Sequence, residues 1–260
     1  MPIPAMKFCI ITPTYKRQNT LRRAIESVLQ QSHQDLEMII INDNPNDGTA
    51  LVVSDYSDPR LIFLENESNR GVNASRNRGL DTISKDTEYV IFLDDDDFLA
   101  PNALADLATI LEKTPYPWLL TARGSTEENP TTQTIHNGVF SYAHDYLLTR
   151  KIKGDATHCI NANLIREHSL RFPTRITQAE EWLFYFCLGR FTQMYYIAKV
   201  TTLTDGYSAS GLNLRKRTTR EQLHTLTLIF TEARSRKITF DPNFWIYFVL
   251  RTLRAFIKRK

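Results

Sequence analysis

Four consecutive aspartates, Asp94 to Asp97, directly follow an apolar segment and are the strongest chemical feature of the sequence. Adjacent carboxylates raise one another's pKa unless a cation or hydrogen-bond donors compensate them. Mg²⁺ or Mn²⁺ is the simplest compensating group, because these ions take oxygen ligands and leave positions for phosphates. An acid run is more often a solvated turn that caps the next helix, but its place at a strand end favours a metal site.

Polar residues also follow two other apolar segments. The segment over 8–12 ends in TPTY, and the segment over 36–41 is followed by NDN. Tyr15 offers a flat face for a base, and Asp43 offers an acceptor for a ring or ribose donor. Each motif alone is also ordinary turn chemistry, so their agreement in position is the evidence for one shared site.

An arginine-containing segment, NRGVNASRNRG, occupies residues 69–79. Gly71 allows a tight approach to a helix start, and Arg76 or Arg78 could present a guanidinium fork to a diphosphate. A solvated helix face explains the two arginines equally well. No GxGxxG follows the first strand, which argues against a nicotinamide dinucleotide site, and the chain has no GxxxxGK[ST] loop.

The elements that must position these residues alternate between strand and helix. Strands are predicted over 8–12, 36–41, 61–64, 89–93 and 118–121, with helices over 21–29, 73–83 and 102–111. Such alternation predicts an α/β, Rossmann-like, doubly wound sheet, whose ligands bind beyond the carboxyl ends of the strands. The pattern then blurs: 124–138 is a predicted loop, 158–164 a predicted strand and 180–188 a predicted buried helix.

The chain of 260 residues has a globular composition, with 42% hydrophobic and 23% charged residues, which excludes disordered and low-complexity scaffolds. Three scattered cysteines, Cys9, Cys159 and Cys187, predict no disulfide framework and fit a reducing compartment. The sequence shows no secretory signal and no run of about 18 apolar residues. We therefore expect a cytoplasmic protein.

Residues 211–260 form a basic, mainly helical C-terminal extension with twelve Lys and Arg and three acids. Basic and apolar side chains fall on different faces of its predicted last helix: Arg251, Arg254 and Lys258 on one, and Ile246, Val249, Leu250, Leu253 and Ile257 on another. This pattern fits an anionic membrane surface and a peripheral place on the inner face of the cell membrane. A domain-packing helix with a frayed cationic end is the alternative, and no nucleic-acid module is recognisable.

In their order along the chain, the motifs resemble those of the family 2 glycosyltransferases of the GT-A fold. The resemblance covers roughly residues 6–190 and rests on IITPTYKR, IINDNPNDGT, NRGVNASRNRGL, FLDDDDFLAP and QAEEWLFY. It implies a mixed GT-A sheet over 1–210, with a nucleotide-sugar-binding half at 1–123 and an acceptor and catalytic-base half at 124–210. The implied reaction is inverting transfer of a sugar from a nucleotide diphosphate donor, most often a uridine one, to an acceptor hydroxyl.

The resemblance also implies roles for single residues. On the donor side, those residues are Pro13, Tyr15 and Arg17 along the nucleotide, Asp43 at the uracil, Arg76 at the nucleotide, and Asp94 and Asp95 at the ribose and sugar. Asp96 would be the direct ligand of Mn²⁺ or Mg²⁺, with Asp94 as a second candidate. The run of four aspartates leaves this register open by one residue.

The general base of the family usually comes from a Glu-Asp pair, which reads Glu180-Glu181 in this chain. Glu181 takes the base position with one extra methylene, and Glu180 is the alternate. Either acid could instead cap the helix that begins near Trp182. Trp182 and His158 are candidate acceptor contacts, although core packing is the more common role for both.

These roles predict a metal-dependent enzyme that uses a nucleotide sugar, with a UDP-sugar favoured, and a glycan or lipid-linked acceptor. Bacterial envelope polysaccharide, lipopolysaccharide or capsule synthesis is the expected setting. A phosphatase with an aspartyl nucleophile is one alternative, but its Asp pair should follow the first strand, which here ends in Thr-Pro-Thr. A catalytically silent sugar-nucleotide-binding or membrane-bound scaffold is the other, and the Glu at 181 leaves it open.

Overall fold

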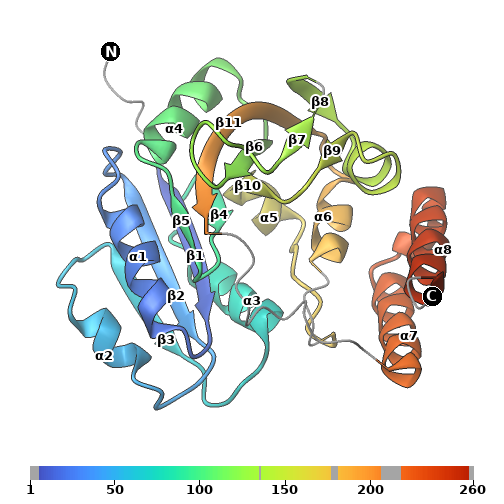
Figure 1. Ribbon diagram of the computed structural model, residues 1–260, viewed down its shortest axis with the longest axis horizontal. Coiled ribbons are helices and arrows are strands. Elements are labelled where there is room, and N and C mark those ends of the chain that lie inside the picture. Colours follow the sequence, from blue (N-terminus) through green and yellow to red (C-terminus); the bar gives the residue numbers. More distant parts are fainter. Residues whose placement is uncertain (1–5, 135, 177–180, 206–217, 258–260) are drawn as a thin grey trace.

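The computed structural model describes residues 6–134, 136–176, 181–205 and 218–257 (Figure 1). Its centre is a nine-stranded mixed sheet in the order β3-β2-β1-β4-β10-β6-β11-β5, with β8 paired to β11. The parallel half contains β1 (Phe8–Thr14), β2 (Leu36–Asn42), β3 (Leu61–Glu65) and β4 (Tyr89–Phe92). The prediction of a doubly wound α/β sheet is confirmed.

The second half of the sheet makes it mixed. Its strands are β5 (Asp97–Leu99), β6 (Trp118–Gly124), β8 (Gly138–Phe140), β10 (Ala156–Asn161) and β11 (Met194–Thr204), beside a small ladder of β7 (Gln133–Thr134) and β9 (Ile152–Lys153). Strand β10 runs antiparallel to both β4 and β6, whereas β11 is parallel to β6. The predicted loop over 124–138 thus contains β7 and the first residue of β8.

The predicted strand over 158–164 is wrong in its second half. Strand β10 ends at Asn161, and helix α5 (Ala162–Glu167) begins at the next residue. The Asn161 side chain accepts hydrogen bonds from the backbone N–H groups of Asn163 and Leu164. This side-chain cap satisfies orphan donors of the first helical turn and so ends the strand.

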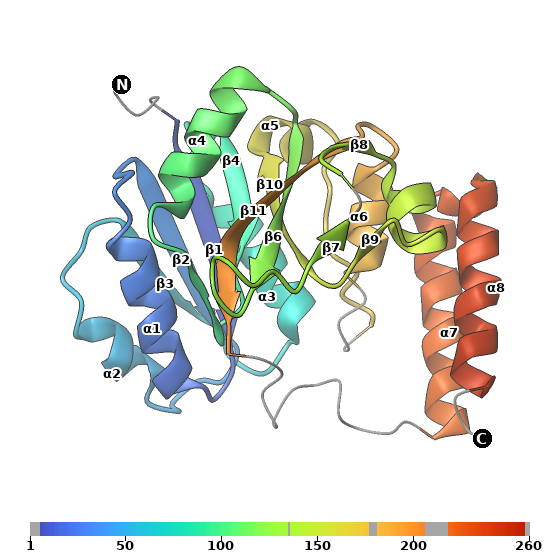
Figure 2. The same cartoon turned by 45° about the horizontal axis from the view of Figure 1, so that its top comes forward.

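Helices cover both faces of the sheet. They are α1 (Gln18–Leu29), α2 (Thr49–Ser54), α3 (Val72–Thr82), α4 (Ala103–Lys113), α5 and α6 (Trp182–Leu188). Strand side chains alternate between the faces, so Phe8 and Ile10 of β1 pack with α1 and α4, while Cys9 and Ile11 face the side of α3 and α6. Figure 2 shows α1 and α4 together on one side of the strands.

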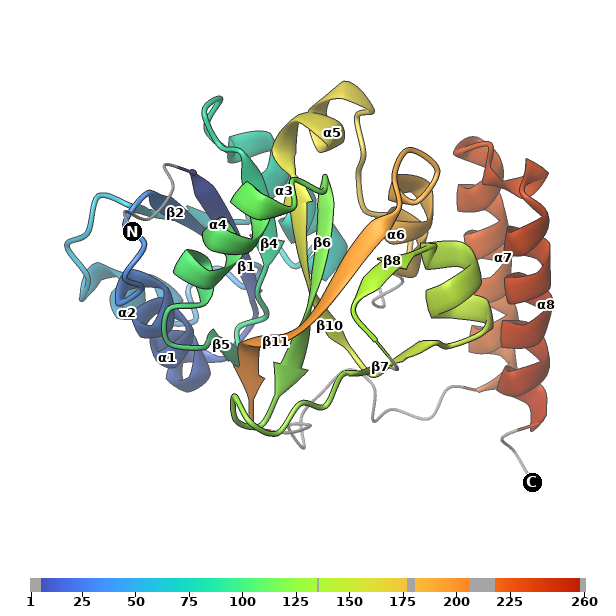
Figure 3. The same ribbon diagram turned by 90° about the horizontal axis from the view of Figure 1, so that it is seen from above.

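The C-terminal extension is helical, as predicted. It forms the hairpin α7–α8, which we define as α7 (Thr219–Ser235), the turn η3 (Ile238–Phe240) and α8 (Pro242–Ile257). Figures 2 and 3 show the two helices side by side at one end of the molecule. A capping box between Thr218 and Glu221 starts α7. No helix among the described residues has both the length and the apolar character needed to cross a membrane.

One expectation for the extension needs correction. Arg251 does not lie on a free basic face, because its guanidinium stands 5.8 Å from the ring centroid of Trp182 in α6. The side chains of Arg254 and Ile257 and all of Lys258 lie outside the described residues. A cation held against an indole face contributes to packing as well as to charge.

Helix α3 approaches β1 very closely at Gly79. A Cβ atom at this position would lie 2.5 Å from Cγ2 of Ile11 and 3.1 Å from Cδ1 of Ile41. These distances are shorter than a normal van der Waals contact, so the absence of a side chain sets the distance between helix and sheet.

Replacement of Gly79 by valine should therefore destabilise the fold. Gly79→Val should lower the free energy of unfolding by about 2 kcal/mol, since overpacking a core costs about 1–3 kcal/mol. Urea denaturation measures this change. Thr109→Val, which places the same side chain on an exposed position of α4, is the control and should change stability by less than about 0.5 kcal/mol. Equal midpoints for the two variants would contradict the tight contact.

Candidate active site

The end of β1 is joined to the aspartate cluster by direct hydrogen bonds. The Thr14 hydroxyl donates to Oδ2 of Asp95 at 2.7 Å, and the Tyr15 backbone N–H donates to the same oxygen at 3.4 Å. Arg17 forms ion pairs with Asp95, at 3.2 Å, and with Asp96. The expected donor residues Tyr15, Arg17 and Asp95 thus lie together, and Pro13 belongs to the same strand end.

Asp43 lies directly beyond β2, next to the end of β1. Its backbone N–H donates to the Thr14 carbonyl at 2.8 Å. Its carboxylate accepts the backbone N–H groups of Arg70 at 2.8 Å and of Gly71 at 2.7 Å, together with the Asn66 side chain. Gly71 has a φ of +86°, a conformation that favours glycine. Asp43 therefore fixes the turn that leads into α3.

Arg76, on α3, links two distant parts of the sequence. Its guanidinium lies 2.8 Å from Oδ1 of Asp94 and 3.1 Å from Oε1 of Glu181, and its side chain is only 5% exposed. Burial lowers the pKa of Arg76, but the carboxylates of Glu181 and Asp94 outweigh it and raise the pKa above its usual value. Arg78, the alternative, instead donates to the Glu65 carbonyl at the end of β3.

The four aspartates have four different environments, and arginines compensate all of them. Asp97 is buried and ion-paired with Arg123, whereas Asp94 and Asp96 keep 40% and 31% of their side chains exposed. Carboxylate oxygens of Asp94, Asp96 and Asp97 lie within 4.8 Å of one another. Such an oxygen-only set fits Mg²⁺ or Mn²⁺, with Asp94 and Asp96 as the accessible ligands.

The net charge of the site also fits a divalent cation. Five carboxylates, four from the aspartates and one from Glu181, meet three guanidinium groups in the ion pairs described here. Two negative charges remain when all five acids are ionised. The arginines therefore reduce the repulsion within the cluster without neutralising it.

The pKa values of two neighbouring aspartates move in opposite directions. Burial raises the pKa of Asp94, but the guanidinium groups of Arg76, Arg123 and Arg17 together outweigh this effect and bring the pKa below its usual value. Burial raises the pKa of Asp95 to about 6, although Thr14 and Arg17 oppose the shift. Asp95 is thus a buried acid that ionises near neutral pH.

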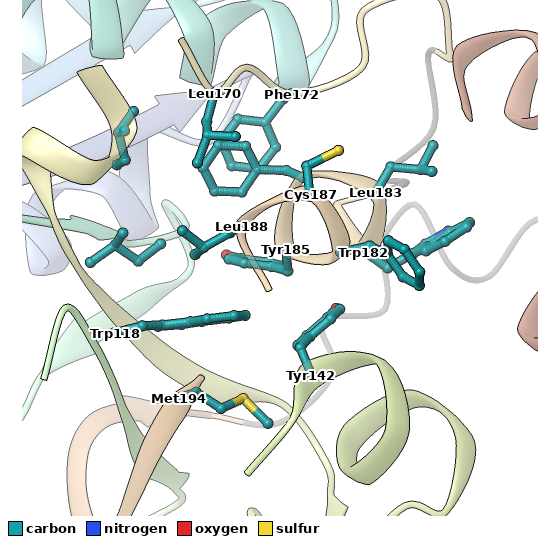
Figure 4. Packing of buried hydrophobic residues seen from close by; sticks show 14 of the residues in the cluster. Trp118, Tyr142, Leu170, Phe172, Trp182, Leu183, Tyr185, Cys187, Leu188 and Met194 are labelled. Atoms are coloured by element: carbon teal, nitrogen blue, oxygen red, sulfur yellow. The ribbon is translucent and has the colours of Figure 1, made fainter. Parts of the chain in front are cut away.

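The two candidate acceptor residues are both largely buried. His158 stacks on Tyr185 at 3.9 Å and accepts a hydrogen bond from the Trp118 indole N–H through Nδ1. Burial lowers the pKa of His158 to about 3, so the ring is neutral at pH 7. Trp182 packs on Phe244 of α8. Figure 4 shows Tyr185 beside Trp118 in this aromatic layer.

Several site residues were not predicted from the sequence. Arg123 at the end of β6 pairs with Asp97, and Arg23 of α1 pairs with Asp205, just beyond β11, while donating to the Asp96 carbonyl at 3.2 Å. The strand-end rule could have found Arg123. Glu180, the alternate base, lies outside the described residues, whereas Glu181 stands immediately before α6.

The raised pKa of Asp95 predicts a pH-dependent effect on stability. Because the folded pKa exceeds the unfolded one, stabilisation by the protonated acid is complete below about pH 4 and disappears as pH rises through 6. The Asn side chain of Asp95→Asn stays neutral at every pH. Without divalent cations, the free energy of unfolding of this variant should therefore rise relative to wild type by up to about 3 kcal/mol between pH 4 and 7.

Urea denaturation with a chelator at several pH values measures this difference. Asp58→Asn is the control of opposite sign, because hydrogen bonds from Arg60 lower the pKa of Asp58 to about 2. The stability of Asp58→Asn relative to wild type should fall as pH rises from about 2 to about 4, and should then stay constant up to pH 7. An Asp95→Asn difference that does not change with pH would contradict the predicted shift.

Comparison with known proteins shows to which family the chain belongs. The profile of glycosyl transferase family 2 matches residues 9–171. GalNAc(5)-diNAcBac-PP-undecaprenol beta-1,3-glucosyltransferase of Campylobacter jejuni is 42% identical over 104 residues, which are 39% of this chain and 33% of that protein. UDP-Glc:alpha-D-GlcNAc-diphosphoundecaprenol beta-1,3-glucosyltransferase WfgD of Escherichia coli is 35% identical over 95 residues, 36% of this chain and 37% of WfgD.

A solved structure extends the likeness beyond these segments. S. aureus TarS 1-349 in complex with UDP-GlcNAc superposes with a TM-score of 0.73 at 19% identity, over 87% of this chain and 66% of that chain. At this identity the likeness shows the fold alone. The alignments span about a third of the length of the two curated relatives. The family profile covers more than half of the chain, and the protein therefore belongs to glycosyl transferase family 2 and has its GT-A fold.

Proposed function

We propose that this protein is an inverting glycosyltransferase that moves a sugar from a nucleotide diphosphate donor, with a UDP-sugar favoured, to a hydroxyl of a glycan or lipid-linked acceptor. Residues 1–123 form the donor half in this proposal, residues 124–210 the acceptor half, and residues 211–260 the extension. We place the reaction at the cytoplasmic face of a bacterial membrane, in the synthesis of envelope polysaccharide, lipopolysaccharide or capsule.

The ion-pair bridge through Arg76 is the observation that carries this proposal. One buried guanidinium lies against Asp94, at the carboxyl end of β4, and against Glu181, at the start of α6. A donor-side acid and the candidate base, 87 positions apart in the sequence, therefore face one site. Ligands of doubly wound sheets bind at this edge, which supports a reaction between a donor and an acceptor there.

Glu181 is assigned as the general base because its carboxylate is partly exposed and has a fixed counterion. Its side chain is 35% exposed, so one face is open to an acceptor hydroxyl. In the proposed step Glu181 takes the hydroxyl proton while that oxygen bonds to the anomeric carbon. The bond from this carbon to the phosphate oxygen breaks on the opposite face, so one displacement inverts the centre.

Arginines balance the charge that develops on the leaving diphosphate. Arg17 lies at the acid cluster, and Nε of Arg76 has no hydrogen-bond acceptor among the described residues. A buried donor of this kind is available to an oxygen of the ligand. Asp96, with Asp94, would hold Mn²⁺ or Mg²⁺, which supplies positive charge to a diphosphate leaving group when bound.

The names of the relatives support the donor and acceptor classes. WfgD is named for UDP-glucose and a diphosphoundecaprenol-linked acceptor, and the C. jejuni relative is named for an acceptor linked to undecaprenol. The solved TarS complex contains UDP-GlcNAc. These names make a UDP-sugar and a polyprenyl-diphosphate glycan the first substrates to test.

The phosphatase alternative receives no support from the end of β1. No Asp pair stands at that position. The strand ends in Thr14, whose hydroxyl donates a hydrogen bond to Asp95. The silent scaffold keeps the same fold and metal cluster, so only a transfer assay separates it from an enzyme.

Metal-dependent donor binding should depend on Asp96. UDP with Mn²⁺ should stabilise the wild-type protein against unfolding by about 2.7 kcal/mol at 100 times its Kd, and GDP, CDP and dTDP should do less. Asp96→Ala should lose the Mn²⁺-dependent part of this shift, measured by thermal unfolding. Asp106→Ala on α4, whose acid pairs with Lys199, should keep it. A full shift in Asp96→Ala would show that the chosen metal register is wrong.

If Glu181 is the general base, its replacement should abolish sugar transfer without affecting donor binding. Glu181→Gln should retain Mn²⁺-dependent UDP binding and lose transfer by about 10²–10⁴-fold, the usual contribution of general base catalysis. The assay follows UDP release from UDP-glucose with N-acetylglucosamine-diphosphoundecaprenol as acceptor. Glu180→Gln is the matched control and should keep activity. Loss of transfer in Glu180→Gln alone would move the base to the neighbouring residue.

A further inference from the structure

The hairpin α7–α8 has two apolar faces, and only one of them is covered by the part of the chain that the structure describes. On the inner face Ile229, Ala233 and Phe244 are fully buried in the core. The outer face carries seven of the eleven exposed large hydrophobic side chains found among the described residues: Leu223, Phe230, Phe240, Trp245, Ile246, Val249 and Leu253. A helix at the surface of a soluble domain needs one apolar stripe, so the second stripe indicates an interaction surface.

The exposed side chains form one continuous surface, which we call the outer face. On α8, Trp245, Val249 and Leu253 repeat every four residues and therefore share one side of the helix. The ring of Trp245 lies 5.8 Å from that of Phe230, which joins the stripe of α8 to that of α7. Phe240 projects from the turn between the helices and is 85% exposed.

Positive charge accompanies the outer face. Arg220, Arg234 and Lys237 are exposed and form no ion pair with any residue that the structure describes. Arg234 lies eleven positions after Leu223 and thus on the same side of α7. The acids of the hairpin are engaged internally: Glu221 in the capping box of α7, Glu232 with Arg236, and Asp241 with the Asn243 backbone N–H.

We infer that the outer face of α7–α8 docks on the surface of an anionic lipid bilayer. Exposed aliphatic side chains, an indole beside them and flanking basic residues match the interface between acyl chains and anionic head groups. A second copy of the chain fits less well, because pairing two outer faces would bring like charges together. The inference rests on the proposed function in so far as a lipid-linked acceptor brings this enzyme to a membrane.

Docking at this face would also orient the catalytic half. The inner face of α8 packs on Trp182, the first residue of α6, through Phe244 and Tyr247. Glu181 directly precedes this helix. The surface that meets lipid is therefore connected through one packed layer to the proposed base.

Vesicle sedimentation tests the inference. We expect the wild-type protein to sediment with vesicles that contain about one third phosphatidylglycerol, and much less with phosphatidylcholine alone. Val249→Glu and Leu253→Glu should each weaken binding about tenfold or more, because each replaces an exposed aliphatic side chain that would insert into the bilayer with an anion. Leu51→Glu is the matched control: Leu51 is 73% exposed on α2, far from the hairpin in sequence, and its change should leave binding intact.

Two further measurements locate the contact. Trp245 is the one exposed tryptophan among the described residues, with Trp118 and Trp182 buried, so vesicles should shift the fluorescence emission to shorter wavelength. Trp245→Phe should lose this shift while still sedimenting. Arg234→Gln with Lys237→Gln should weaken binding about fivefold for each charge removed, and high salt should do the same.

The outcomes separate this inference from the proposed function. Wild-type protein that stays in solution with anionic vesicles, or Val249→Glu and Leu253→Glu binding as well as wild type, would overturn it. Concentration-dependent dimers that Val249→Glu abolishes, without vesicle binding, would replace the bilayer with a second copy. The Mn²⁺-dependent UDP shift is measured on the same variants and should not change; its absence in the wild type instead contradicts the proposed enzyme.

Discussion

The ion pairs that balance the aspartate cluster constrain everything else in this site. An unpaired buried charge is strongly unfavourable, so the buried guanidinium of Arg76 needs carboxylates close to it. Those carboxylates come from the end of β4 and from the residue before α6. Helix α3 must consequently lie where the Arg76 side chain can reach both carboxylates. The close packing of the helix on the sheet at Gly79 permits that position.

Compensation of a buried charge also explains why the turn that leads into α3 is organised around Asp43. Three N–H donors, from Arg70, Gly71 and the side chain of Asn66, converge on one carboxylate at the end of β2. Each bond to an ionised acceptor is stronger than a neutral one, and together they fix the start of α3. Asp43 therefore positions the helix that carries Arg76. Its proposed contact with the uracil would add to this structural role.

The sequence predicted the parallel half of the sheet because its strands are short continuous apolar runs bounded by turn residues. It did not predict β11, whose pairing with β6 is interrupted by register shifts between Ile197 and Val200 and between Val200 and Thr202. Such irregularities break the period-2 pattern on which sequence analysis depends. The helical character of the C-terminal extension was predicted, but its folding into a hairpin was not. The partner of Arg251 was not predicted either, because Trp182 lies 69 positions earlier in the chain.

The register of the aspartate cluster shows what only the structure adds. Sequence motifs left the metal ligand uncertain by one position, since four identical residues are indistinguishable by type. In the fold, the chain turns between β4 and β5, and burial alternates: Asp95 and Asp97 point inward, to Thr14 and Arg123, while Asp94 and Asp96 stay partly exposed. The Asp97 backbone N–H donates to the Asp94 carbonyl at 3.1 Å, so the burial pattern belongs to a hydrogen-bonded turn. The accessible pair is therefore spaced as Asp-x-Asp, and this spacing supports Asp96 with Asp94 as the proposed metal ligands.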